Sequence, residues 1–163
     1  MKKIIILLLV FWSSYMNAQT LLSVDHIKLE KASDYKAAEP FVLQTATYLL
    51  SSPLKKDDTD RMNLLGFIGK WMHGTPDYSF AFSDIVTKIG KDNNDIIGLY
   101  MAAMTKYTLE NKAPSRDAKV VKLNALILLL NYCENKDNNI RMTKQLKKLS
   151  EAREKGQLEQ SLL

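Results

Sequence analysis

The chain has 163 residues with 23 Lys and Arg against 18 Asp and Glu, a modest positive balance that does not require an anionic partner such as nucleic acid. The single cysteine excludes an intramolecular disulfide and a structural zinc site built from several thiolates. Six glycines and four prolines are too few for a turn-rich β sandwich, so the composition favours an all-α fold.

The N-terminal residues have the pattern of a secretory signal peptide. Lys2 and Lys3 precede an apolar run over residues 4–12, and Ala18 ends a short polar stretch. A charged start, a short apolar segment and a small residue at the cleavage point suit the export machinery. The apolar run is shorter than the ~20 residues that span a bilayer, so a retained anchor is the weaker alternative. We expect cleavage of residues 1–18 after Ala18 and export to the periplasm or the extracellular space, with no transmembrane span in the mature chain.

Without the signal peptide, the chain is long enough for one domain. Residues 19–36 contain one alternating stretch, at residues 26–30, with no second run to pair with it. They are predicted to form an irregular N-terminal arm, followed by a helical domain over residues 37–163. The first helix is expected to begin near Pro40, because proline suits the first helical position, and to end before Ser52. The alternative is that a short helical turn from Asp34 precedes this helix.

The second and third helices are predicted to meet at a tight junction, Gly74-Thr75-Pro76-Asp77. In this interpretation Gly ends a helix over about residues 61–73, Thr caps the next, Pro occupies its first position and Asp lies near its positive end. The third helix would then present Tyr78 and Phe82 on its apolar face and end at Gly90.

Three more helices are expected further along the chain. A fourth covers about residues 95–111 and should be largely buried, because apolar residues surround much of it. A fifth reaches about residue 135 with Ser115 as its N-cap, and its six consecutive apolar residues favour a core helix over a membrane span. A sixth covers about residues 139–155 and is stopped by Gly156.

The tetrapeptide Lys-Asp-Asn-Asn occurs at residues 91–94 and again at residues 136–139, each time ahead of a predicted helix. This spacing would suit a helical-hairpin repeat. The residues that follow do not match, however, so similar capping chemistry arising twice is the simpler explanation. We predict a single domain of about six antiparallel helices, with a TPR-like or other α-α superhelix as the alternative.

The best candidate for a site is the predicted helix junction, where Trp71, His73, Asp77 and Tyr78 lie close together in the sequence. A histidine near a carboxylate would suit a general base and hence a hydrolase. The competing interpretation is structural, because helix macrodipoles favour His at a C-terminus and Asp at an N-terminus. We therefore assign no catalytic residue, and name these four residues and Tyr100 as candidates for binding a ligand or partner.

No metal ion or cofactor is expected. His26 and His73 are the only histidines, and neither has a second ligand one helical turn away. The acidic run at residues 57–60 lacks the glycine and the terminal glutamate of an EF-hand loop, and no phosphate-binding or dinucleotide motif occurs. Cys133 lies in an apolar setting, which predicts an inert thiol with a raised pKa.

The outer face of the predicted sixth helix carries four basic residues, Arg141, Lys144, Lys147 and Lys148. Such a face can touch anionic lipid headgroups. Glu151 and Glu154 interrupt it, so a solvated face is the simpler interpretation.

Four stretches make the chain similar to a set of small, exported, all-helical proteins of Gram-negative bacteria that have no assigned activity: residues 38–40, 70–78, 98–107 and 132–135. These stretches are distributed over most of the chain that follows the signal peptide. The resemblance implies a signal-bearing helical domain, and it supplies no catalytic or binding residue.

We expect a non-enzymatic binding or accessory protein that presents a helical surface or groove to a protein partner in the cell envelope. One alternative is a carrier that holds a small apolar ligand between helices, because the middle of the chain is rich in aromatic residues and methionines: Tyr78, Phe80, Phe82, Tyr100, Met101 and Met104. The other alternative is a hydrolase centred on His73 and Asp77.

Overall fold

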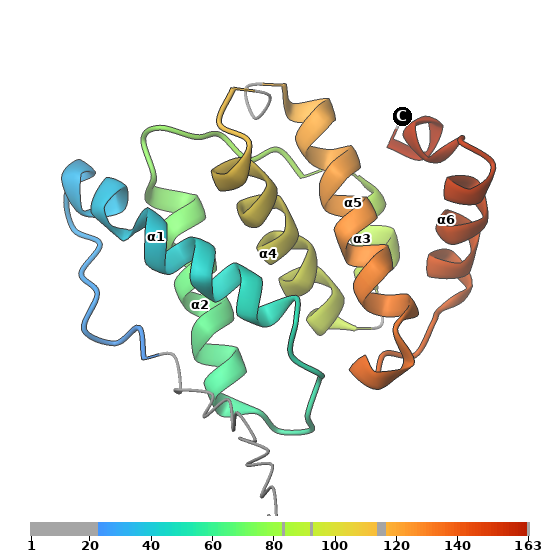
Figure 1. The fold of residues 1–163 in the computed structure, drawn as a ribbon, viewed down its shortest axis with the longest axis horizontal. Helices are drawn as coiled ribbons and strands as arrows, with labels where there is room; N and C mark the ends of the chain where they lie inside the picture. Colours follow the sequence, from blue (N-terminus) through green and yellow to red (C-terminus); the bar gives the residue numbers. More distant parts are fainter. Residues whose placement is uncertain (1–22, 83, 92, 114–116, 163) are drawn as a thin grey trace, which may run out of the picture.

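The computed structural model describes residues 23–82, 84–91, 93–113 and 117–162, and these residues contain helices and loops but no strand (Figure 1). The helices are α1 (Ala32–Leu49), α2 (Thr59–Gly74), α3 (Asp84–Gly90), α4 (Asn94–Glu110), α5 (Ala118–Glu134) and α6 (Lys144–Glu154), with the short 3₁₀ helices η2 (Lys136–Asn138) and η3 (Leu158–Leu162). The six α-helices form one domain, which confirms the all-α prediction. In the described part of the chain, no helix is long and apolar enough to cross a bilayer. The predicted signal peptide lies outside the described residues.

Helix α4 lies at the centre of the fold, and it packs against α1, α2, α3 and α5 (Figure 1). Its residues are buried around most of the helix, as predicted. Helices α4 and α5 run side by side in opposite directions (Figure 1). Helix α6 packs against α3 and α5, at the end of the molecule remote from α1 and α2 (Figure 1).

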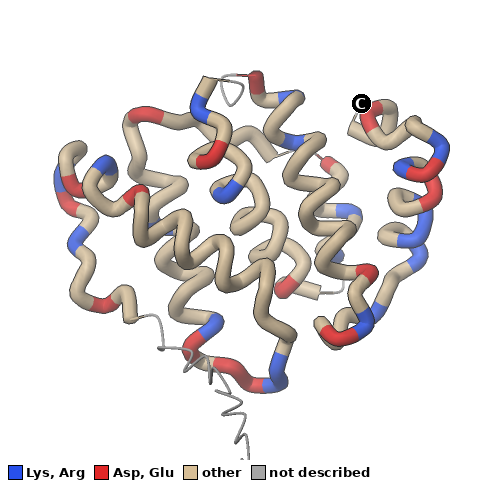
Figure 2. Tube along the Cα trace, in the orientation of Figure 1, with Lys and Arg blue, Asp and Glu red and all other residues tan. Residues whose placement is uncertain are grey.

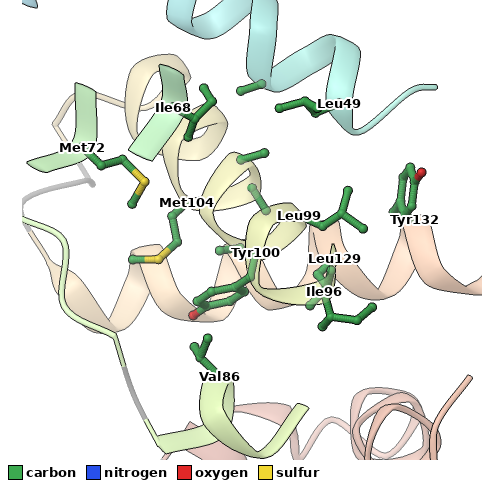
Figure 3. Packing of buried hydrophobic residues seen from close by; sticks show 14 of the residues in the cluster. Leu49, Ile68, Met72, Val86, Ile96, Leu99, Tyr100, Met104, Leu129 and Tyr132 are labelled. Carbon is green, nitrogen blue, oxygen red and sulfur yellow. The ribbon is translucent and has the colours of Figure 1, made fainter. Parts of the chain in front are cut away.

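The core consists mainly of aliphatic side chains, and all six α-helices contribute to it. Figure 3 shows Leu49 of α1 and Ile68 of α2 facing the buried side of α4 around Leu99. Burial of apolar area is the main favourable contribution to such a fold. The largest fully buried side chains are Leu49, Ile68, Trp71, Ile89, Ile96, Leu99, Tyr100, Met104, Leu126, Leu129, Leu130 and Leu146.

Helix α1 begins at Ala32, earlier than the predicted start near Pro40. The Asp34 carboxylate accepts hydrogen bonds of 3.1 Å from the backbone N–H groups of Glu30 and Lys31, and so caps the helix at this earlier point. Pro40 lies inside the helix with an exposed side chain. The segment predicted as an irregular arm is therefore helical from Ala32 onward.

The prediction that the third helix begins at Pro76 is wrong, because residues 75–82 are not helical and α3 covers only Asp84–Gly90. The Thr75 N–H donates to Trp71 O at 2.9 Å, which closes α2. Thr75 itself is extended, as steric contact with a following proline favours. Tyr78 is half-buried and its neighbours in the sequence are exposed, an alternation with the period of an extended chain. Packing of this segment outweighed the local helix-start signals.

The starts of α5 and α6 also differ from the prediction. Ser115 lies outside the described residues, and the side chain of Asp117 caps α5 by accepting hydrogen bonds from the backbone N–H groups of Lys119 and Val120. Helix α6 begins only at Lys144, where the Thr143 hydroxyl accepts from the Leu146 N–H at 3.2 Å.

The two Lys-Asp-Asn-Asn tetrapeptides have different structural roles. In the first, Asn93 caps α4 by accepting from the Asp95 N–H at 2.9 Å. The second forms η2 and ends at Asn139, whose φ of 56° is left-handed and stops any continuation into a helix. The Asn139 side chain donates to Leu54 O at 3.1 Å instead. The shared sequence therefore gives no support for a structural repeat.

A buried arginine joins α1, α2 and α5. The Arg61 side chain is 3% exposed, and its Nη2 donates to Leu49 O at 2.7 Å. Its Nη1 donates to the carbonyl oxygen and hydroxyl of Ser52, at 3.4 and 3.1 Å. The Tyr132 hydroxyl donates to Ser52 O at 2.7 Å and completes the network. A cation suits this position, because the last carbonyls of a helix lack partners and carry partial negative charge.

Candidate functional site

Three aromatic side chains meet where the segment after α2 folds back over that helix. The Trp71 indole is fully buried and donates from Nε1 to Tyr35 O at 3.0 Å. The rings of Tyr78 and Phe80 lie 5.8 and 6.0 Å from the Trp71 ring, at tilted angles. These contacts hold residues 75–82 against α2.

A cavity of about 440 Å³ lies beside this aromatic cluster. We call it the aromatic groove, and it is lined by Gly69, Met72, His73, Thr75, Tyr78, Ser79, Phe80, Phe82 and Met101. Its chemistry is mixed: two thioethers and three aromatic rings supply apolar surface, and His73 adds an imidazole. Phe82 lines the groove and is 50% exposed.

On the other side of Tyr78, the buried carboxylate of Glu39 contacts charged and polar side chains from distant parts of the chain. Glu39 of α1 is 8% exposed. Its Oε1 lies 3.1 Å from Lys36 Nζ and accepts from the Tyr78 hydroxyl at 3.4 Å, and its Oε2 accepts from Lys112 Nζ at 2.7 Å. Lys36 also lies 3.5 Å from Asp77 Oδ2. We call these five residues the Glu39 cluster.

The Glu39 cluster borders a second cavity, of about 490 Å³. Lys36, Asp77 and Lys112 line it, together with Tyr78 and Ser79, which also line the aromatic groove. Residues 78–79 therefore lie between the aromatic groove and the charged cavity and line both.

The environment shifts the pKa values of four groups in the Glu39 cluster: those of Lys36 and Lys112 are raised, chiefly by their hydrogen bonds to Glu39, and those of Glu39 and Tyr78 shift as follows. Burial alone would raise the pKa of Glu39, but the hydrogen bonds and charges of Lys112 and Lys36 outweigh it and lower that pKa below the usual glutamate value. Burial, followed by the negative charge of Glu39, raises the pKa of Tyr78. Near neutral pH the cluster therefore holds a carboxylate and a neutral phenol.

His73 and Asp77, the residues of the hydrolase hypothesis, are brought to different cavities. His73 lines the aromatic groove, and Asp77 lines the charged cavity and pairs with Lys36. Within the described ranges, no hydrogen bond or ion pair joins His73 to Asp77. This arrangement does not orient the imidazole as a general base needs.

The other candidate residues divide between groove and core. Tyr78 lines both cavities. Trp71 and Tyr100 are fully buried core residues. The Tyr100 hydroxyl donates to Lys122 O at 3.3 Å, and burial raises its pKa to about 12.

Sequence reasoning missed Glu39, Lys112 and Met72 as parts of these cavities. A signal for Glu39 was present, because it shares one helical stripe with the buried Val42 and Ala46 at the spacing of a core face. A charged residue on such a stripe requires a buried partner. No comparable local signal marks Lys112, which reaches Glu39 from a loop that is far away in the sequence.

Across the described ranges, no group of three or more His, Cys, Asp and Glu side chains is placed to hold a metal ion. Cys133 is buried, and burial raises its pKa to about 12, as predicted for an inert thiol.

No protein-family model, curated protein or solved structure matches this chain. The similarity to small exported helical proteins stays a prediction. The functional argument therefore rests on the two cavities and their residues.

The Glu39 cluster predicts a specific pH dependence of stability. Because the folded-state pKa of Glu39 is lowered, its contribution is present above the usual glutamate pKa and is lost as the pH falls through the depressed value. We expect Glu39→Gln to lower stability near neutral pH and to flatten the loss of stability in this acidic range. Urea unfolding at a series of pH values measures both effects. The matched control is the exposed Glu110: Glu110→Gln should keep the wild-type pH profile, and an identical profile for all three proteins would contradict the prediction.

Proposed function

We propose that the protein is an exported, non-enzymatic binding module whose aromatic groove receives an apolar side chain of a protein partner in the cell envelope. The observation that carries this proposal is Phe82, a large ring that lines the groove and keeps half of its surface exposed. An exposed apolar ring beside a concave surface of mixed polarity offers area that a partner can remove from water.

The composition of the groove supports binding of a side chain rather than chemistry. Met72 and Met101 bring flexible thioethers that adapt to the shape of an inserted group. Aromatic residues such as Phe80 and Phe82 often dominate the energy of protein interfaces. Because the cavity has only about 440 Å³, we expect one anchoring side chain of the partner to enter it.

Polar groups adjoin the groove where an interface rim would lie. Tyr78 connects the groove to the charged cavity, and exposed Lys36, Asp77 and Lys112 line the latter. A rim of polar side chains around an apolar centre is the usual anatomy of a protein interface. Export of the protein is part of the proposal, and it is supported by the signal-peptide pattern of residues 1–18.

Phe82→Ala is expected to weaken partner binding by about tenfold or more, because truncating an anchoring aromatic residue at an interface costs on the order of 2 kcal/mol. Stability should change little, because the ring is half-exposed. Crosslinking in an envelope extract identifies the partner, and titration calorimetry with the purified partner measures the affinity.

Phe41→Ala is the matched control, because Phe41 is 44% exposed on α1 and does not line the aromatic groove. It should leave the affinity unchanged. Equal losses in the two variants, or an extract that yields no specific partner, would reject the proposal.

A second candidate function at the same groove is transport of a small apolar ligand. The observation in its favour is the cavity volume of about 440 Å³, which falls in the range of about 300–1,000 Å³ typical of small-molecule sites. Of the six residues expected to hold such a ligand, Tyr78, Phe80, Phe82 and Met101 line the groove, whereas Tyr100 and Met104 are core residues. Native mass spectrometry of protein from its own compartment tests this function: a bare polypeptide mass would count against it.

A hydrolase centred on His73 and Asp77 has less support, because the two side chains line different cavities. A hydrolase substrate panel tests it directly. Activity that disappears in His73→Ala would favour an enzyme over a binding module.

A further inference from the structure

Positive charge is concentrated in one short part of the chain. Residues 19–163 contain 21 Lys and Arg and 18 Asp and Glu. Six of these basic residues and two of these acidic residues lie within residues 141–155. The rest of that range therefore has 15 basic and 16 acidic residues and is close to neutral. Almost the whole region of high positive charge belongs to α6 and the loop before it, at one end of the molecule (Figure 2).

Five of these six cations are exposed on one outward face, and the sixth, Arg153, is half-buried and pairs with Glu134. The basic face consists of six exposed residues: Lys88, Arg141, Lys144, Lys147, Lys148 and Lys155. On α6, positions 144, 147, 148 and 155 share one side of the helix, and the opposite side buries Leu146 and Leu149 in the core. The cations at residues 144–155 extend over about 16 Å along the helix axis.

Two cavities flank α6, and the basic face lines both. Arg141, Lys144, Lys147 and Lys148 line one of about 810 Å³, and Lys88, Lys148 and Lys155 line one of about 370 Å³. Glu151 is the acidic residue in both linings. Among the residues that the structure describes, ion pairs involve Lys36, Lys106, Lys112, Lys119 and Arg153, and none involves the basic face.

We propose that the basic face docks on the surface of an anionic lipid bilayer. Four features of the face fit this partner. It is extended, exposed and rich in lysine, and among the described residues none of its cations forms an ion pair, although the Glu151 side chain lies on the same side of α6. Clusters of four to eight basic residues on a helix are attracted to anionic headgroups, and the attraction grows with each cation near the surface.

Other polyanions fit the basic face less well. The two cavities have no aromatic side chain in their linings, and stacking platforms are characteristic of proteins that bind single-stranded nucleic acid. A protein interface usually has an apolar centre and few lysines, whereas Met142 is the one half-buried apolar side chain in the larger cavity. A small anion would engage only part of a face that is about 16 Å long.

The test is sedimentation of the full-length protein with vesicles of phosphatidylcholine alone or with added phosphatidylglycerol. We expect binding that requires phosphatidylglycerol and weakens as sodium chloride is raised, because salt screens exposed charges. The triple variant Lys144→Gln, Lys147→Gln, Lys148→Gln should bind at least about tenfold more weakly. Glutamine keeps the helix propensity of lysine, so α6 should stay folded, and circular dichroism checks this.

The matched control is Lys55→Gln, Lys56→Gln, Lys70→Gln, which removes the same charge from exposed lysines outside the basic face. It should bind within about threefold of the wild type. Both variants keep the N-terminal apolar run, so its contribution to vesicle binding cancels. A second variant, Lys88→Gln with Lys155→Gln, should also weaken binding and tests the smaller cavity.

Three results would overturn the proposal: equal binding to both kinds of vesicle, equal losses in the triple variant and its control, or release by inorganic phosphate but not by chloride of equal ionic strength. The last result would indicate a site for a small anion. None of these results depends on the aromatic groove, so this test and that of the partner-binding function succeed or fail independently.

Discussion

Replacing Arg61 by Met is expected to destabilise the protein by about 2–4 kcal/mol, which makes it one of the most damaging substitutions in the chain. The guanidinium is the partner of Leu49 O and of Ser52 at the buried end of α1. A methionine fills similar space but removes the donor to Leu49 O and to the Ser52 hydroxyl, while Ser52 O keeps only the Tyr132 hydroxyl, and a buried acceptor that loses its partner cannot recover it from water. Urea unfolding monitored by circular dichroism measures the change.

Lys70→Met on the same helix is the control, since Lys70 is exposed. It should change stability by no more than about 0.5 kcal/mol. The loss of stability in Arg61→Lys should lie between those of Arg61→Met and Lys70→Met. Lysine keeps the positive charge but lacks the branched guanidinium, which donates to two groups at once. If Arg61→Met and Lys70→Met are equally stable, the buried network does not hold α1, α2 and α5 together.

Trp71→Ala should be the other large loss, of about 3–5 kcal/mol, because it empties a fully buried site and removes two ring contacts. Trp71→Phe retains most of the apolar volume and loses the Nε1 hydrogen bond to Tyr35 O, so its cost should be smaller. Thermal and urea unfolding of the two variants measure the difference. A Trp71→Ala protein as stable as Trp71→Phe would show that the cavity collapses without cost.

His73→Ala is the matched control for Trp71→Ala, because His73 is two residues away and exposed. It should leave stability nearly unchanged. We expect partner binding to fail in Trp71→Ala together with stability, since Tyr78 and Phe80 lose the ring on which they pack. In Phe82→Ala, partner binding should be lost while stability is kept. This contrast distinguishes a residue that supports the groove from a residue that contacts the partner.

Helices α2 and α4 could be predicted well because local signals agreed with their packing. Both combine apolar residues at helical spacing with a capping side chain directly before the helix. Asp58 caps α2 by accepting from the Arg61 N–H at 3.0 Å, and Asn93 caps α4. Where pattern and cap coincide, the error in the boundaries is small.

Residues 75–82 show where the prediction failed. Thr75, Pro76 and Asp77 each favour a helix start, and Tyr78 and Phe82 are spaced for a helical face. The same residues also fit an extended chain, in which Tyr78 and Phe80 point to one side. The contacts of both rings with Trp71 favour the extended conformation. These contacts are made across the fold, so they could not be predicted from local sequence patterns.

The crowding of aromatic and polar residues in the sequence directed attention to the segment after α2. The structure has two cavities there, and Tyr78 lines both. The pairing of His73 with Asp77 rested on their closeness in the sequence, and the two side chains line different cavities. The net charge of the whole chain also gave an incomplete picture of its surface. The small overall value averages a strongly basic segment, residues 141–155, with the nearly neutral remainder of residues 19–163.

Local chemistry was therefore enough to indicate an all-α protein, the approximate positions of most of its helices, and an N-terminal pattern for export. These properties depend on composition, spacing and capping within a few residues. The buried charges of Arg61 and Glu39 and the division of the site into two cavities depend instead on segments up to 80 positions apart, such as Ser52 and Tyr132. A buried polar group is stable only where distant partners meet it, so its neighbours emerge only when the helices are packed together.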